Sequence, residues 1–137
     1  MIDRFLPGLD GKMEDPVDFT CMTVSMPGDL DPFERHGRFA IHLDAELRLA
    51  GLGCCSGGGT LYTHVDFDAE DPTEGADAAT ILDIDATDVE RARALLRLHL
   101  PELGAPAGTL VQYGPHEDRF DGEGWQLHEP RGDLQQE

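Results

Sequence analysis

The stretch ATILDIDATDVERARALLRLHLPELG, residues 79–104, carries the clearest structural signals in the sequence. Residues 79–86 are rich in branched side chains, which favour a β-strand. Thr87 then stands three positions before Glu90, the spacing of a helix capping box. An apolar stripe at the helical period follows, formed by Val89, Ala92, Leu96 and Leu100. The stretch therefore predicts a strand followed by a helix that closes near Pro101 and Gly104.

Three flanking segments supply further elements. Residues 17–26 alternate along the chain and predict one strand, and the segment GTLVQYG, residues 108–114, predicts another. Residues 39–50, FAIHLDAELRLA, fit either a strand or a helix, because their apolar side chains satisfy both periods. We interpret this segment as a helix, since Ala, Leu, Glu and Arg are strong helix formers. Gly51 then stands where a helix commonly ends.

The stretch GLGCCSGGGTLY, residues 51–62, contains three consecutive glycines. A phosphate-binding P-loop would need a lysine beside the glycines, and none is near. A dinucleotide-binding loop would need a helix after them, whereas residues 61–67 alternate like a strand. We therefore expect Gly57–Gly59 to form a tight turn with positive φ between a short strand at 52–56 and the strand at 61–67.

The order of these elements predicts an α+β fold, a ferredoxin-like βαββαβ sandwich with an antiparallel sheet and two helices on one face. Residues 17–114 form this single domain. Residues 1–16 are expected to be an N-terminal arm. Residues 115–137 are expected to be a polar C-terminal tail, in which Trp125 and Leu127 form a lone apolar cluster.

The chain resembles a set of small uncharacterised bacterial proteins in three segments: the run LDAELRLAGLGCCSGGGT, the run ILDIDATD, and the helix that closes in LGAPAGT. In that set a helix ending in GLG leads to a GGGT turn, and a later helix closes in an LGAP-GT strand entry. The resemblance covers about two thirds of the chain. It implies the βαββαβ fold and no established chemistry, so it assigns no role to any residue. Cys54 and Cys55 depart from its pattern.

The chain is strongly acidic, with 28 Asp and Glu against 10 Lys and Arg and a formal net charge of −18. No basic residue lies between Arg48 and Arg91. Such a charge repels nucleic acids and anionic membranes and attracts basic proteins. The odd number of cysteines does not form a disulfide framework, and no segment reads as a signal peptide or a membrane span. We therefore expect a cytoplasmic protein.

Motifs for catalysis and metal binding are missing from the sequence. There is no Gly-x-Ser-x-Gly motif and no Cys-x-x-Cys pair, and no two histidines stand at a metal-binding spacing. An alternation of His64, Asp66 and Asp68 would bind a divalent cation only weakly. We predict no catalytic residue, no metal and no cofactor, and the sequence favours a non-enzymatic protein over an enzyme.

The preferred hypothesis is a non-enzymatic binding protein that inhibits a basic protein partner, in the manner of an immunity protein or antitoxin that blocks a toxin. Opposite charges would speed its association with that partner. The residues expected to bind the partner are Tyr62, Asp66, Phe67, Asp68, Glu70, Asp71, Glu74 and Asp77. One alternative is a ferredoxin-like enzyme that binds a small molecule or a metal. This enzyme could form a dimer through the open face of its sheet. A second alternative is a structural domain that self-associates as a homodimer.

Overall fold

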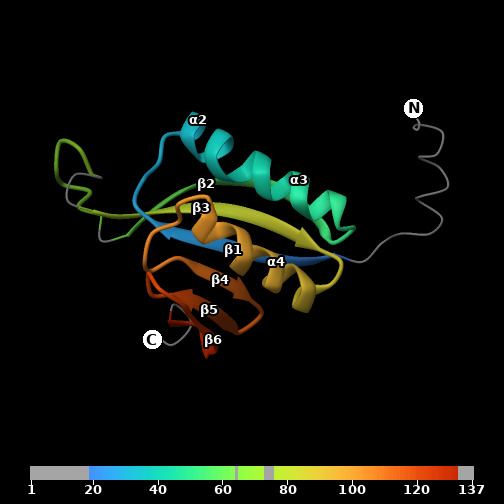
Figure 1. The fold of residues 1–137 in the computed structure, drawn as a ribbon. Coiled ribbons are helices and arrows are strands. Elements are labelled where there is room, and N and C mark those ends of the chain that lie inside the picture. The colour runs from blue at the N-terminus through green and yellow to red at the C-terminus, as the bar shows by residue number, and fades with distance from the viewer. Residues whose placement is uncertain (1–18, 64, 73–75, 133–137) are drawn as a thin grey trace.

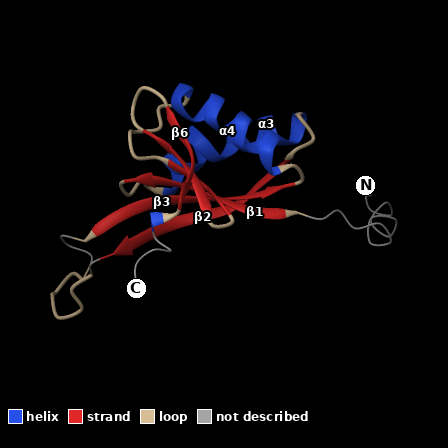
Figure 2. Ribbon diagram, turned by 90° about the horizontal axis from the view of Figure 1, so that it is seen from below, coloured by secondary structure: helices blue, strands red, loops and turns tan. Residues whose placement is uncertain are grey.

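The computed structural model describes residues 19–63, 65–72 and 76–132. These residues form an antiparallel sheet of six strands with two helical stretches on one face (Figure 1, Figure 2). The sheet order is β2-β3-β1-β4-β5-β6. Its strands are β1 (Thr20–Pro27), β2 (Gly53–Thr63), β3 (Asp77–Ala86), β4 (Leu110–Tyr113), β5 (His116–Phe120) and β6 (Trp125–Pro130).

The first helical stretch joins β1 to β2. It runs without a break through α2 (Pro32–Glu34), the π-helical turn η1 (Arg35–Ala40) and α3 (Ile41–Leu49). The Asp31 side chain caps its beginning by accepting the Glu34 N–H at 2.9 Å. The helical interpretation of residues 39–50 is therefore confirmed. The π-helical turn was not predicted.

The second helix, α4 (Val89–Glu102), joins β3 to β4 and buries Ala92, Leu96 and Leu100 as the apolar stripe predicts. Its cap differs from the prediction. The Asp88 side chain, not that of Thr87, accepts the N–H of the first turn, at 3.1 Å from the Arg91 nitrogen. Thr87 instead donates its hydroxyl to the Gly51 carbonyl at 3.2 Å, which ties the start of α4 to the end of α3.

The hydrophobic core lies between the sheet and the two helical stretches. Alternate residues of β1 point toward the helices, and Met22, Val24 and Met26 are almost completely buried. They meet the buried faces of both helices, which include Leu43, Leu47, Leu96 and Leu100. The alternate residues of β1 and the residues on one face of α4 thus pack together in one core.

The three glycines do not form a turn. Gly57–Gly59 lie inside β2 and pair with Asp83, Leu82 and Ile81 of β3, and none of them has a positive φ. The strand is irregular just before them, where the register shifts between Cys55 and Gly57. A Cβ atom at Gly58 would overlap the Ile81 carbonyl oxygen, so the close approach of β2 to β3 requires a glycine there. β2 ends at Thr63, so the strand expected to extend to residue 67 is shorter.

The prediction of an α+β fold with an antiparallel sheet and two helices is confirmed, but the four-stranded ferredoxin-like sandwich is not, because the sheet has six strands. The two additional strands, β5 and β6, come from the segment expected to be a polar tail. They continue the sheet beyond β4, and Trp125 packs against Phe120 with their ring centroids 5.1 Å apart. The expected N-terminal arm, residues 1–16, lies outside the described residues.

Candidate functional site

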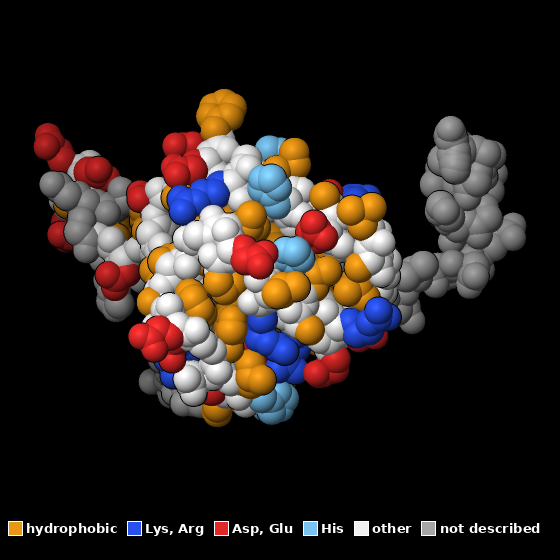
Figure 3. All heavy atoms as spheres, in the orientation of Figure 1, with side chains coloured by type: hydrophobic (Ala, Val, Ile, Leu, Met, Phe, Trp, Pro, Cys, Tyr) orange, Lys and Arg blue, Asp and Glu red, His pale blue; other side chains and the backbone are white. Residues whose placement is uncertain are grey.

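Five of the residues predicted to bind a partner lie in the β2–β3 connection (residues 64–76): Asp66, Phe67, Asp68, Glu70 and Asp71. Tyr62 lies near the end of β2, and Asp77 begins β3. Figure 1 shows the connection extending from the end of these strands, away from both helices. Figure 3 shows carboxylates on this projection, apart from the body of the molecule. Glu74 lies outside the described residues, as does His64.

Asp66 shapes the beginning of the connection. Its carboxylate accepts the Asp68 N–H at 3.0 Å, and its own N–H donates to the Pro72 carbonyl at 3.2 Å. This is the local turn chemistry that aspartate favours. Asp66 therefore has a structural role in the connection, and Asp66 and Asp68 lie in a turn rather than on the strand that the cation hypothesis requires.

The two aromatic residues of the predicted surface differ in their surroundings. The Tyr62 hydroxyl lies 3.4 Å from a carboxylate oxygen of Asp29, to which it donates a hydrogen bond. Phe67, in contrast, is 83% exposed and lies between the exposed carboxylates of Asp66 and Asp68. Of these two aromatic side chains, Phe67 is therefore the more exposed.

All three cysteines of the chain lie within the described residues. Cys21, Cys54 and Cys55 are all free thiols. Burial raises the pKa of the Cys55 thiol, so this group stays protonated at neutral pH. No group of three or more His, Cys, Asp or Glu residues in the described part of the chain is arranged to hold a metal ion.

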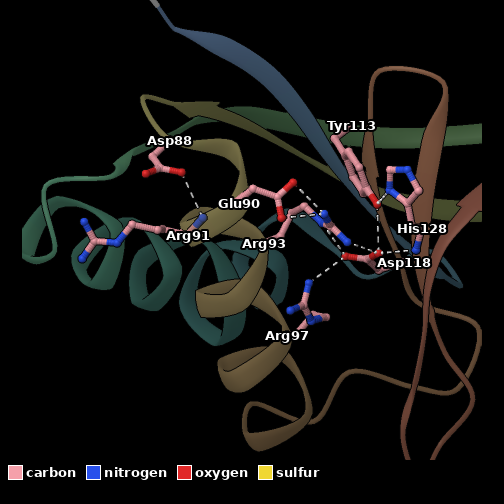
Figure 4. A network of polar contacts seen from close by, with 8 residues as sticks. All are labelled: Asp88, Glu90, Arg91, Arg93, Arg97, Tyr113, Asp118 and His128. Atoms are coloured by element: carbon pink, nitrogen blue, oxygen red, sulfur yellow. Dashed lines mark hydrogen bonds and ion pairs between the residues drawn. The ribbon is translucent and has the colours of Figure 1, made fainter.

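A buried polar network that the sequence analysis missed centres on Asp118 of β5 (Figure 4). Arg93 of α4 donates from Nε and Nη2 to the two carboxylate oxygens, at 2.9 and 2.8 Å. Arg97 donates from Nη1 at 3.0 Å and the Tyr113 hydroxyl at 3.2 Å. The His128 N–H adds a fifth hydrogen bond at 2.9 Å. The network joins α4, β4, β5 and β6 through one completely buried carboxylate.

Burial and hydrogen bonding determine which groups of this network carry a charge. Burial acts to raise the Asp118 pKa, but hydrogen bonds from Arg93, the His128 N–H and Arg97 outweigh it and hold that pKa below its ordinary value. Burial, together with the nearby Asp118 charge, raises the pKa of Tyr113 to about 12. Asp118 is therefore ionised and Tyr113 protonated at neutral pH, and these states suit a cross-link that stabilises the fold.

At the surface, the network ends in a pair of stacked histidines. The His116 and His128 rings lie 3.8 Å apart between centroids, and His128 Nδ1 lies 2.8 Å from the Tyr113 hydroxyl. His128 has a positive φ of 58°, which is uncommon outside glycine. This backbone conformation lies where the β5–β6 register shifts and directs the His128 N–H toward Asp118. No spacing in the sequence indicated the histidine pair, because its members lie on separate strands.

The lowered pKa of Asp118 predicts a specific loss of stability in acid. The folded chain keeps this carboxylate ionised where the unfolded chain takes up a proton, so its stabilisation is complete above about pH 4 and disappears as the pH falls through the folded-state value. We expect the stability difference between the wild-type protein and Asp118→Asn to shrink below pH 4. Urea unfolding at a series of pH values measures it, and a difference that stays constant into acid would contradict the prediction.

No protein-family model, curated protein or solved structure matches the sequence of this chain. The resemblance to small bacterial proteins therefore stays a prediction. Within the described residues, no helix has the length and apolar character needed to cross a membrane.

Proposed function

We propose that this protein binds a basic protein partner through the β2–β3 connection and inhibits it, in the manner of an immunity protein or antitoxin. The observation that carries the proposal is the exposure of Phe67, 83%, on a projecting segment whose neighbouring side chains are carboxylates. An exposed aromatic side chain in such a place can insert into a pocket of the partner. The surrounding carboxylates would then contact its basic groups.

The two paired strands that carry the connection support this function. β2 and β3 pair from Gly53 to Thr63 and from Asp77 to Ala86, so the connection is carried on a long two-stranded stem. β3 in turn pairs with β1 in the middle of the sheet. A segment held on a stem of this kind loses less conformational freedom on binding than a free tail, which favours affinity.

The total charge supports the same function. At −18, the protein attracts a cationic partner over a distance and accelerates their encounter. Salt screens such attraction, so the association rate is expected to fall steeply as the ionic strength rises. The carboxylates of the connection would add specificity, because a partner without matching cations would leave them unpaired.

Charge reversal within the connection tests the proposal. The partner is first captured at low salt from lysate of the producing cell and then purified. We expect Asp68→Lys/Glu70→Lys to slow its association about tenfold or more at low salt, because two attractive charges become repulsive. Surface plasmon resonance at several salt concentrations measures this rate.

A matched variant controls for net charge. Glu102→Lys/Glu123→Lys makes the same change in total charge at exposed positions outside the connection, and we expect it to slow association only slightly. Phe67→Ala is expected to speed dissociation at least tenfold, since an anchoring aromatic contributes about 2 kcal/mol. Equal effects of the two charge reversals, or an unchanged dissociation rate for Phe67→Ala, would place the interface elsewhere.

A further inference from the structure

A cavity of about 300 Å³ lies between the first helical stretch and the edge strand β2, on the helix side of the sheet. One wall comes from the π-helical turn η1 and the start of α3. The opposite wall comes from β2 between Cys55 and Gly58, and Leu82 of β3 also lines the cavity. This volume is at the lower end of the range for small-molecule sites in proteins.

Local irregularities in both walls create this space. η1 replaces the regular α-helical turn with a wider π-helical one, a feature that often accompanies functional sites. Opposite it, the register of β2 shifts between Cys55 and Gly57, and neither Gly57 nor Gly58 has a side chain to fill the gap. The cavity therefore follows from how the two elements are built and not from a loosely packed core.

The cavity contains a cation whose charge is not compensated. Asp44 and Arg48 neutralise each other, because Arg48 Nε lies 3.0 and 2.9 Å from the two Asp44 oxygens. Asp44 also accepts the Cys55 N–H at 2.9 Å, which fixes α3 to the edge of β2. Arg35 makes no ion pair with any residue in the described part of the chain, and its Nε lies 3.5 Å from the position that a Gly58 Cβ would occupy.

Within the described residues, Arg35 thus lacks an ion pair although the net charge of the chain is −18 and carboxylates are abundant. Arg35 is half-buried, and His36 stands beside it at the cavity. The remaining lining includes the apolar side chains of Ala40, Ile41 and Leu82. A guanidinium group binds a carboxylate through two parallel hydrogen bonds, and an apolar wall favours an apolar body next to it.

We propose that this cavity binds a small organic monoanion, a carboxylate attached to an apolar body, with the carboxylate on Arg35 and the body against Ala40, Ile41 and Leu82. The site lies on a different part of the molecule from the β2–β3 connection, so it does not depend on the proposed function. It identifies a ligand class that the acidic sequence alone argues against.

Benzoate is a suitable probe, because it combines one carboxylate with a compact apolar ring. In ¹H–¹⁵N NMR titrations at neutral pH, we expect saturable shifts of the Arg35, Gly57 and Gly58 amides, with a dissociation constant on the order of 1 mM for so small a ligand. Arg35→Gln is expected to weaken binding at least tenfold. Arg91→Gln, which removes an exposed arginine of α4, controls for the change in charge and is expected to bind like the wild type.

Two further titrations complete the test. Inorganic phosphate offers an anion without an apolar body and is expected to bind at least tenfold more weakly than benzoate. Asp68→Lys/Glu70→Lys is expected to bind benzoate unchanged, which separates this site from the partner surface. Shifts that do not saturate, equal binding by Arg35→Gln, or phosphate binding as tight as benzoate binding would each overturn the proposal.

Discussion

Asp118→Asn is expected to lower the free energy of unfolding by about 3–5 kcal/mol at neutral pH, a large part of the stability of a domain of this size. Asn keeps the shape of the side chain but loses its charge. The Arg93 side chain, only 7% exposed, would then be a buried cation that, among the described residues, retains Glu90 as its single ionic partner. An amide group would also place hydrogen-bond donors against the donors of Arg93 and Arg97. Urea unfolding followed by circular dichroism measures the loss.

A surface ion pair provides the control for this prediction. Glu129→Gln breaks the pair between Arg119 Nε and Glu129 Oε1, which are 3.2 Å apart with both side chains more than one-third exposed. Exposed pairs contribute about 0–1 kcal/mol, so this variant is expected to unfold nearly like the wild type. A loss below about 1 kcal/mol for Asp118→Asn would show that the network contributes little to stability.

Gly58→Ala is expected to destabilise the fold by about 1–3 kcal/mol, because the added methyl group overlaps the Ile81 carbonyl oxygen and must force β2 away from β3. The overlap is with backbone, which cannot move aside as a flexible side chain does. Thermal unfolding is expected to show a lower midpoint. The amides of β2 are expected to lose protection from hydrogen exchange before those of β1 do.

The neighbouring glycine is a matched control within the same strand. A Cβ atom at Gly59 would meet no heavy atom within 4 Å beyond its chain neighbours, and its φ is not positive. Gly59→Ala is therefore expected to be neutral, or to stabilise by about 0.4–1 kcal/mol through the loss of chain entropy in the unfolded state. Equal destabilisation by both substitutions would mean that the glycine segment of β2 tolerates no added side chain, and the specific overlap at Gly58 would not be the reason.

The candidate surface could be predicted from the sequence only in part. The sequence shows that the carboxylates and Phe67 lie close together in one segment. In the structure, this segment projects from the end of the sheet. It also gives Asp66 a structural role in the turn and brings Tyr62 to Asp29. The Arg35 cavity could not be predicted, because its walls come from separate elements and its π-helical turn has no recognised sequence pattern.

The two C-terminal strands, β5 and β6, could not be predicted from the sequence. Residues 116–120 read HEDRF and looked polar, so they were expected to lie in a solvated tail. In the fold, Asp118 is buried because Arg93, 25 positions earlier in the chain, supplies its counter-charge from another element. A burial pattern scored by apolarity cannot recognise a buried carboxylate whose partner is distant in sequence.

The sequence by itself determined the elements whose signals are local. The spacing of Ala92, Leu96 and Leu100 specified the buried face of α4. The alternation of residues 17–26 indicated a strand, but apolar side chains stand on both of its faces, so the buried face of β1 was not specified. Tertiary structure alone decided the path of Gly57–Gly59. Glycine favours turns only by lacking a side chain, and the backbone hydrogen bonds to β3 outweigh that weak local preference. Long-range pairing also added β5 and β6, and β5 can be buried because the charges around Asp118 come together only in the folded chain.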